Sequence, residues 1–388
     1  MRSVAAFMAE GVVRLVEEDG PDALPLARGH VLLRPLEVGV CGTDREIAAF
    51  AYGSAPPGKD RLVLGHEAVA EVARTGEGVE RVRPGDLVVP MVRRPCDRVE
   101  CPACRAGRQD FCTTGEFIER GIRRADGFMT ELVVDEERYL VHVPPTAFEL
   151  GVLVEPLSIT AKAFAQLDAI LTRLPWEHDG ARGLVLGAGP IGVLTAMGLV
   201  ARGARTVVYS REPEDDDRAE LVRSIGAEYV SSGSADVPGL VRRAGPFDVI
   251  IEAVGAPEFA FQAVRALAPN GVFIVTGVPA PRPAIGFDAA GLMRDLVLHN
   301  QVIVGTVNAG SASYEEAVRM LERFLILFPD SVRRVIQRRV AIDEAPALLR
   351  QPGGGVKTVI RIAEAAAATR DERLPTPGRA AARPDRGG

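Results

Sequence analysis

The sequence predicts an α/β protein in which a β-rich N-terminal domain is followed by a doubly wound parallel sheet. Short β-branched runs separated by Gly, Pro and charged residues fill the first half of the chain, which is typical of strands joined by tight turns. From Gly183 onward, strand patterns alternate with longer helical patterns, as in an open parallel sheet. A glycine-rich turn follows the first strand of that second half and opens a helix.

Individual elements can be placed from these patterns. In the first half we expect strands at 31–34, 69–72 and 86–90, the last preceded by a Pro-Gly turn. In the second half we expect strands at 183–186, 206–209, 248–251 and 272–275, and helices at 191–201 and 218–225. Residues 364–388 contain almost no large apolar side chain, which predicts a disordered tail.

Composition excludes several classes of function. The chain has 388 residues, 47% of them hydrophobic and 25% charged, as in a soluble protein of two domains or one large one. Its net charge is −6 and its basic residues form no aromatic-interleaved patch, so we expect no nucleic-acid partner. No uninterrupted apolar run approaches the roughly 18–20 residues that span a bilayer. The N-terminus does not resemble a signal peptide, so we expect a cytoplasmic protein with no membrane partner.

All five cysteines can be assigned to zinc. Four of them lie in one stretch with the spacing Cys-x4-Cys-x2-Cys-x7-Cys, namely Cys96, Cys101, Cys104 and Cys112. Four thiolates in one loop can close a tetrahedral shell, as a structural zinc site requires. Two disulfides could use the same cysteines, but in a chain without a secretory signal this spacing is more typical of a metal site. We expect a structural zinc lobe at about 93–115.

The fifth cysteine predicts a second, open zinc site. Cys41 lies in the run GVCGTD (39–44), and GHE follows at 65–67 with His66 and Glu67. A lone cysteine is more often a small buried thiol. A thiolate with an imidazole and a carboxylate, however, supplies three ligands and leaves one position for water or substrate. We therefore expect an enzyme with two zinc ions per chain and its reaction at the open one.

The glycine-rich turn predicts a dinucleotide site. Residues 187–192 read GAGPIG and fit G-x-G-x-x-G, which is informative here because the run lies between a strand and a helix. Glycines permit a tight turn and close approach of the pyrophosphate, and the helix N-terminus supplies free N–H groups. The expected cofactor contacts are Gly187, Gly189, Pro190, Ile191 and Gly192.

The end of the next strand predicts which dinucleotide is used. NAD enzymes place an acidic residue there, about 20 residues beyond the glycines, on the ribose hydroxyls. This chain reads Tyr209-Ser210-Arg211, with Glu212 one place later. Arg211 can receive a 2′-phosphate with Ser210 as a hydrogen-bond donor, whereas Glu212 keeps NAD as an alternative. We expect NADP as the preferred cofactor.

Together these residues resemble the zinc-dependent medium-chain dehydrogenase superfamily and, within it, the glucose 1-dehydrogenases. The superfamily motifs are GHE (65–67), the cysteine lobe, EPLS (155–158) and the glycine-rich turn. The glucose branch is indicated by the Cys-x4-Cys opening of the lobe, GRQDFC (107–112), SRE (210–212), LHNQ (298–301) and GTVN (305–308). The resemblance covers residues 1–362.

The resemblance implies a fold and a role for each matched residue. The fold would be a GroES-like catalytic domain (1–155), a Rossmann domain (156–303) and a return to the catalytic domain (304–363). Cys41 and His66 would ligate the catalytic zinc, with Glu67 either as a ligand or orienting the ligands. Glu155 would alternate with Glu67 or contact the substrate, and Thr43 would receive the substrate hydroxyl proton. Relatives often carry a histidine shortly after this relay, where the chain has Arg45-Glu46-Ile47, so the proton would leave through water or Glu46.

The implied reaction is oxidation of an aldose, with D-glucose as the expected substrate, at C1. Zinc would polarise the anomeric hydroxyl and C1 would pass a hydride to the nicotinamide, giving a lactone. Besides Thr43 and Glu155, the implied substrate contacts are Glu116, His299 and Asn308. Two alternatives stay open: a polyol, amino-alcohol or cyclitol dehydrogenase of the same superfamily, and a nucleotide-binding protein without turnover. We expect a homodimer or homotetramer.

Overall fold

The computed structural model describes residues 1–176, 180–280, 283–351 and 353–364. Its strands are β1 (Arg2–Phe7), β2 (Val12–Glu17), β3 (His30–Val40), β4 (Arg61–Val63), β5 (Glu67–Thr75), β6 (Leu87–Pro90), β7 (Arg93–Arg94), β8 (Ile118–Arg120), β9 (Arg124–Ala125), β10 (Val133–Glu136), β11 (Leu140–His142), β12 (Arg182–Leu186), β13 (Arg205–Ser210), β14 (Glu228–Ser231), β15 (Phe247–Glu252), β16 (Leu267–Val275), β17 (Val302–Gly305), β18 (Ile336–Ala341) and β19 (Lys357–Arg361). Its helices are α1 (Gly42–Ala48), α2 (Pro102–Arg105), α3 (Val154–Leu171), α4 (Pro190–Ala201), α5 (Asp217–Ser224), α6 (Val237–Ala244), α7 (Pro257–Ala263), α8 (Ala289–Leu298), α9 (Ser311–Leu327), α10 (Pro329–Arg333) and α11 (Ala345–Leu349). The predicted disordered tail lies, apart from Glu364, outside the described residues.

The first half of the chain forms a mainly antiparallel β structure around the long strand β3. Among the described residues, the largest sheet of this half has the order β11-β6-β5-β3-β19-β18, and β10 also pairs with β3. Strand β19 comes from the C-terminal end of the chain and pairs antiparallel with β3, Thr358 opposite Val40. This pairing carries C-terminal side chains to the end of β3, where Cys41 follows.

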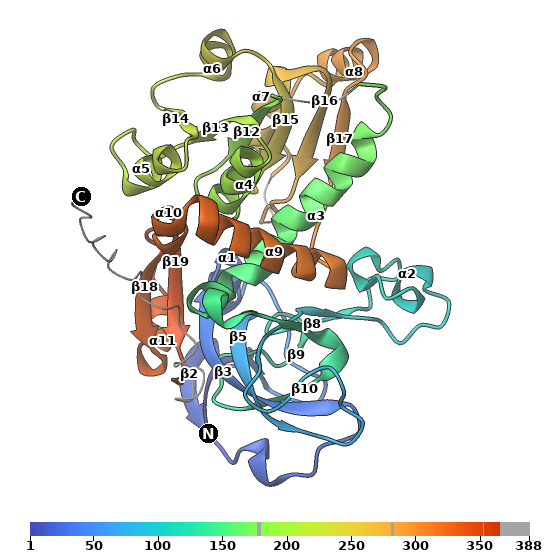
Figure 1. The fold of residues 1–388 in the computed structure, drawn as a ribbon, viewed down its shortest axis with the longest axis vertical. Helices are drawn as coiled ribbons and strands as arrows, with labels where there is room; N and C mark the ends of the chain where they lie inside the picture. Colours follow the sequence, from blue (N-terminus) through green and yellow to red (C-terminus); the bar gives the residue numbers. More distant parts are fainter. Residues whose placement is uncertain (177–179, 281–282, 352, 365–388) are drawn as a thin grey trace, which may run out of the picture.

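The second half forms a parallel sheet with the strand order β14-β13-β12-β15-β16-β17. Its strand pairs are parallel throughout the described part, and this is the order of a Rossmann fold. The order reverses between β12 and β15, and ligands of such sheets bind at the carboxyl ends of the strands beside that point. Figure 1 shows this sheet above the β-rich half. The predicted α/β class, with a β-rich domain and a doubly wound sheet, is confirmed.

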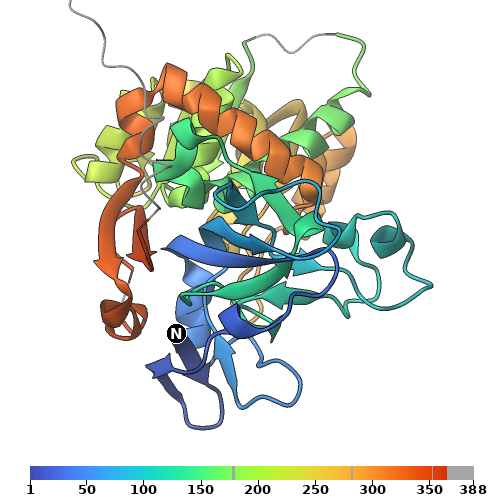
Figure 2. The ribbon, with the colours of Figure 1, turned by 60° about the horizontal axis from the view of Figure 1, so that its bottom comes forward.

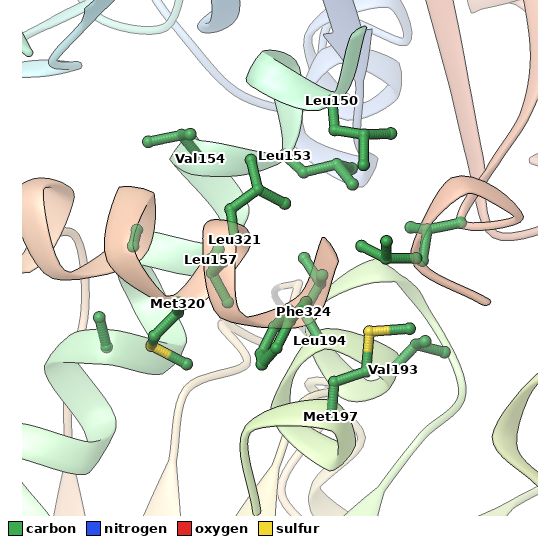
Figure 3. Close-up of a cluster of buried hydrophobic side chains, with 14 of the residues drawn as sticks. Leu150, Leu153, Val154, Leu157, Val193, Leu194, Met197, Met320, Leu321 and Phe324 are labelled. Atoms are coloured by element: carbon green, nitrogen blue, oxygen red, sulfur yellow. The ribbon is translucent and has the colours of Figure 1, made fainter. Parts of the chain in front are cut away.

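Three helices join the two halves through one apolar core. Figure 3 shows Leu157 of α3 and Leu194 and Met197 of α4 close to Leu321 and Phe324 of α9. All of these side chains are buried, and α9 crosses the middle of the molecule (Figure 1). Because α3 is fixed by this packing, its first turn is held against the β-rich half.

Helix α3 and the 3₁₀ segment before it are also the one stretch of the described chain with the length and apolar composition of a membrane span, Pro145–Leu171. Most of this stretch is buried inside the protein. Its apolar character is therefore explained by its position as a core helix.

Candidate active site

The four clustered cysteines converge in a lobe that projects from the side of the molecule around α2 (Figures 1 and 2). The Sγ atoms of Cys96 and Cys104 are 3.6 Å apart, and those of Cys101 and Cys112 are 4.0 Å apart. A zinc–sulfur bond of about 2.3 Å in a tetrahedron places sulfurs about 3.8 Å apart. All four cysteines are free thiols, and their Sγ atoms form a group able to hold a metal ion. The spacing thus fits a closed zinc site and does not fit two disulfides.

A second group forms where two strands and a helix meet. Cys41 follows β3, His66 directly precedes β5, and Glu155 lies in the first turn of α3. The Cys41 Sγ atom is 3.1 Å from His66 Nε2, and His66, Glu67 and Glu155 offer ligand atoms within 4.8 Å of one another. Sulfur, imidazole nitrogen and carboxylate oxygen are the donors that zinc takes in open catalytic sites.

The chain before His66 requires a glycine. Gly65 has φ +89°, and a Cβ atom there would lie 2.6 Å from the side chain of Met129 and 2.8 Å from that of Val38. A side chain at this position would therefore displace the imidazole that follows. This close packing explains the glycine of the GHE motif.

Helix α1 begins at the metal-site cysteine. Cys41 is its N-cap, and its Sγ atom accepts a hydrogen bond of 3.2 Å from the Thr43 backbone N–H. In return the Asp44 carboxylate accepts a hydrogen bond of 2.9 Å from the Cys41 backbone N–H. This reciprocal capping holds the thiol at the end of β3 and places Thr43, which is half-buried, in the first turn beside it.

Asp44 is a site residue to which the sequence analysis assigned no role. It is fully buried, and its Oδ1 atom lies 3.3 Å from His66 Nδ1 while His66 Nε2 faces Cys41. A carboxylate on the far nitrogen fixes the tautomer and orientation of a ligating histidine. Burial alone would lower the pKa of His66, but Cys41 and Asp44 raise it well above its ordinary value. The sequence does contain a cue to this role, because Asp44 is the last residue of the GVCGTD run that also contains Cys41.

Lys357 is the second residue that sequence reasoning missed. Its side chain is fully buried, and its ammonium group donates to Glu67 Oε2 and to the Val40 carbonyl oxygen. Burial alone would lower the pKa of Lys357, but the neighbouring Glu67 carboxylate raises it. No local pattern marks this lysine, since only the pairing of β19 with β3 brings it here.

Burial is the main influence on the pKa of Glu155, the remaining carboxylate of the metal-site group. The Glu155 side chain comes from α3, and its pKa is raised to about 7, mainly by burial. Within this net rise, His66 acts to lower the pKa and the neighbouring Glu67 acts to raise it. Glu155 can therefore hold or release a proton near neutral pH when no metal is bound.

The glycine-rich turn has the geometry that a dinucleotide requires. Gly187 follows β12 with φ +101°, a backbone conformation that favours glycine. A Cβ atom on Gly192 would lie 2.0 Å from the Gly187 carbonyl oxygen, so the turn can close only with glycine there. Gly189 is the N-cap of α4, followed by Pro190 and Ile191, and has no side chain to bond the helix amides. These amides lie at the switch point of the sheet, where phosphates bind.

The two residues that follow β13 differ in the exposure of their side chains. The Arg211 side chain is 90% exposed, whereas that of Glu212 is only 14% exposed. Ser210 is buried, and its Oγ atom accepts a hydrogen bond of 3.2 Å from the Ala188 backbone N–H of the glycine-rich turn. The exposed guanidinium is therefore the group that a 2′-phosphate could reach.

Comparison with known proteins decides the family. Residues 148–362 match the family model described as glucose dehydrogenase C-terminus, and residues 27–145 match that of the alcohol dehydrogenase GroES-like domain. Glucose 1-dehydrogenase 1 of Caldivirga maquilingensis is 39% identical over 86% of this chain and 91% of its own length. The chain belongs to the glucose 1-dehydrogenase family of the zinc-containing medium-chain dehydrogenases.

Other family members support the same assignment. Glucose 1-dehydrogenase of Thermoproteus tenax is 38% identical over 90% of this chain and 96% of its own length. The glucose dehydrogenase of Haloferax mediterranei in complex with NADP, Zn and gluconolactone is 34% identical, covers 94% of this chain and 100% of its own, and has a TM-score of 0.85. The protein is thus an NAD(P)-dependent, zinc-dependent, glucose dehydrogenase-like oxidoreductase.

Two of the three additional substrate candidates lie near the cysteine lobe in this family fold. Glu116 is about half exposed and pairs with Arg98 at 2.7 Å on the lobe itself. Asn308 follows β17, and its amide donates a hydrogen bond of 2.9 Å to Glu119 Oε1. The preceding Val307 carbonyl accepts a hydrogen bond of 2.9 Å from the buried Lys162, which is 3.0 Å from the lobe residue Asp110. The segment after β17 is therefore tied to the lobe.

The structure does not bring the third candidate, His299, to the metal-site group. His299 ends α8 ahead of β17, and its carbonyl oxygen accepts a hydrogen bond of 2.7 Å from the Asn270 backbone N–H. It lines a separate cavity of about 350 Å³ beside α7 and α8. The amino end of a parallel strand lies at the edge of the sheet opposite the one where cofactors bind, and the substrate contact expected of His299 stays a prediction.

Proposed function

We propose that this protein oxidises D-glucose at C1 to the lactone and passes the hydride to NADP. The observation that carries the proposal is the group of Cys41, His66, Glu67 and Glu155 in a chain that also has a dinucleotide turn and the exposed Arg211 after β13. The Haloferax mediterranei relative, which has the same fold, was solved with NADP, Zn and gluconolactone. Gluconolactone is the product that C1 oxidation of glucose would give.

Each residue of the group has a separate task in this proposal. Cys41 and His66, with Glu67 or Glu155, would hold the metal, whose chemistry is Lewis-acid polarisation of a bound oxygen. Asp44 holds His66 in its ligating orientation. Thr43, next to the cysteine, would take the proton of the C1 hydroxyl. Glu155, Glu116 and Asn308 would bind the remaining sugar hydroxyls.

A panel of substrates tests the proposal. Initial rates are measured with D-glucose, other aldoses, polyols, amino alcohols and cyclitols, each with NADP and with NAD. Glucose with NADP should give the highest kcat/KM, and gluconolactone or gluconate should accumulate in a one-to-one ratio with reduced cofactor. Cys41→Ala serves as the inactive control. A keto-sugar product, or a polyol as the best substrate, would instead place the protein with the polyol-type alternative.

We also infer the surroundings in which the enzyme acts. Five free thiols suit a reducing cytoplasm.

The domain limits and the oligomeric state are also part of the proposal. The expected limits, 1–155, 156–303 and 304–363, are consistent with α3 beginning at Val154 and with β19 pairing with β3. A homodimer or homotetramer is supported by α8, where Met293, Val297 and Leu298 are each more than half exposed, and by the edge position of β17. Light scattering of the purified protein measures the oligomer.

A further inference from the structure

Glu212 lies two residues beyond the end of β13, one place after the segment where an NAD enzyme would carry its ribose-binding acid. An acidic residue so close to that position keeps NAD as an alternative cofactor. Its side chain, however, is turned inward and is only 14% exposed. The Tyr229 hydroxyl donates a hydrogen bond of 2.8 Å to the Glu212 carbonyl oxygen, so the backbone at this position is held as well.

Both carboxylate oxygens of Glu212 already have donors. Oε2 accepts a hydrogen bond from the Ser210 hydroxyl, and Oε1 accepts one of 2.6 Å from Arg218 Nη1. Arg218 lies in the first turn of α5, and its side chain is 20% exposed. A charge-assisted bond of this kind in a partly buried position is stronger than one between neutral groups. The ribose hydroxyls of a bound dinucleotide would therefore have to share a largely buried carboxylate that already has two donors, one of them a guanidinium.

The neighbouring Arg211 is placed differently. Its Nε atom is 3.6 Å from Glu212 Oε1, which is an ion-pair distance but longer than a hydrogen bond, and its side chain is almost fully exposed. Because Arg218 makes the shorter contact with Glu212, this carboxylate holds Arg211 only weakly. An unpaired Glu212 would both compete for Arg211 and repel a 2′-phosphate.

We infer that Arg218 is a specificity-determining residue that acts through Glu212. It holds the carboxylate away from the ribose hydroxyls and leaves Arg211 free for the 2′-phosphate of NADP. The inference rests on the NADP use proposed above. Arg218 itself is a positioning residue, because its partner in this arrangement is Glu212 and not the cofactor.

Arg218 makes one further contact, and any test must separate its effect from that of the contact with Glu212. Its Nη2 atom donates a hydrogen bond of 2.8 Å to the carbonyl oxygen of Gly355, just ahead of β19. A substitution at Arg218 removes both contacts. A double variant with Glu212→Gln also removes both contacts, but it leaves no carboxylate to be released.

The test measures the dissociation constants of NADP and NAD by calorimetry on the zinc-loaded, full-length enzyme without sugar. Arg218→Met should weaken NADP and strengthen NAD, so that the preference for NADP falls at least about tenfold, the value of one charge-assisted hydrogen bond. Arg218→Lys should keep most of the preference. Glu212→Gln/Arg218→Met should restore it, and Glu212→Gln alone should leave NAD affinity within about twofold of wild type.

Arg223 provides the matched control, because it lies on the same helix and pairs with Glu214. Arg223→Met removes an equal charge and should leave the ratio unchanged. Equal losses for both cofactors in Arg218→Met, or no recovery in the double variant, would overturn the inference. A large loss of NAD affinity in Glu212→Gln would also overturn the inference. This measurement can be made even if the Arg218→Met variant does not fold. Failure of the wild type to bind NADP would instead refute the proposed function.

Discussion

Lys357 and Glu67 form a buried ion pair beside the candidate metal site, although they are 290 residues apart in the chain. The lysine is fully buried and the glutamate nearly so. The pair places one positive charge among Cys41, Glu67 and Glu155, which would all be negative when a metal is bound. The same ammonium group donates to the Val40 carbonyl oxygen at the end of β3. The lysine therefore also ties β19 to the strand that leads into Cys41.

We expect Lys357→Met to destabilise the enzyme by about 3–5 kcal/mol, because the buried Glu67 carboxylate would lose its counter-charge. The double variant Glu67→Gln/Lys357→Met should recover part of this loss. Urea unfolding of the zinc-loaded protein measures both. Equal free energies of unfolding for Lys357→Met and wild type would contradict the importance of the pair.

The purified enzyme should contain two zinc ions per chain, and mild chelation should remove one of them first. The closed four-cysteine site is part of the fold of its lobe, so its binding energy is also folding energy. Cys104→Ala should therefore lower the melting temperature, whereas Cys41→Ala should abolish turnover with the fold intact. Elemental analysis and thermal unfolding of the two variants check this. A single zinc in unchelated, folded wild type would refute the two-site assignment.

Arg211→Ala should weaken NADP binding by about ten- to a hundredfold, the equivalent of about 1.5–3 kcal/mol for hydrogen bonds to a charged group. NAD binding should hardly change, because NAD has no 2′-phosphate. Steady-state KM values for the two cofactors provide the measurement. Equal losses for both would show that Arg211 has a structural role.

Thr43→Val should reduce kcat by about 10²–10⁴-fold, the usual contribution of a positioned proton-transfer group. Thr43→Ser keeps the hydroxyl and should be mildly affected. Because the Thr43 contact with Cys41 is made by its backbone N–H, neither substitution should release zinc. Loss of zinc in Thr43→Val would mean that the variant reports on metal binding and not on the proton relay.

The free energy of unfolding should decrease at acid pH because of Asp135, which is buried and bonded to Arg94 at 2.7 Å. Burial alone would raise the pKa of Asp135, but Arg94 and Arg120 lower it below its ordinary value. A lowered carboxyl pKa gives stability that is present above the unfolded-state value, about 3.9, and is lost as pH falls through the folded-state value. Asp135→Asn should therefore cost about 3–5 kcal/mol at pH 7, and this cost should fall once the pH drops below about 4.

Glu77→Gln is the control for this pH dependence, because its pair with Arg28 is largely exposed. It should cost at most about 1 kcal/mol at any pH. Urea unfolding of both variants and wild type between about pH 2 and pH 7 gives the comparison. A cost of Asp135→Asn that stays constant over this range would show that the ionised carboxylate is not what stabilises the pair.

Secondary-structure elements that were predicted from short sequence patterns are confirmed by the structure. The expected strand at 183–186 lies within β12, and the expected helix at 191–201 lies within α4. The cysteine lobe was equally readable, since its four thiols lie within one short loop and their spacing reflects one metal's geometry. The substrate contact of His299 stays a prediction, because the edge of the sheet on which a residue lies depends on strand direction and length.

The sequence by itself determined the α/β class, the candidate metal donors and the glycine-rich turn, because periodicity and local spacing encode local backbone geometry. Only the tertiary structure decided which distant groups meet at the site. The pairing of β19 with β3 brings Lys357 to Glu67, and the packing of α3 brings Glu155 to His66. It also decided that Arg218 donates a hydrogen bond to the Glu212 carboxylate. Such contacts depend on strand register and helix packing across the whole chain, and no short stretch of sequence records them.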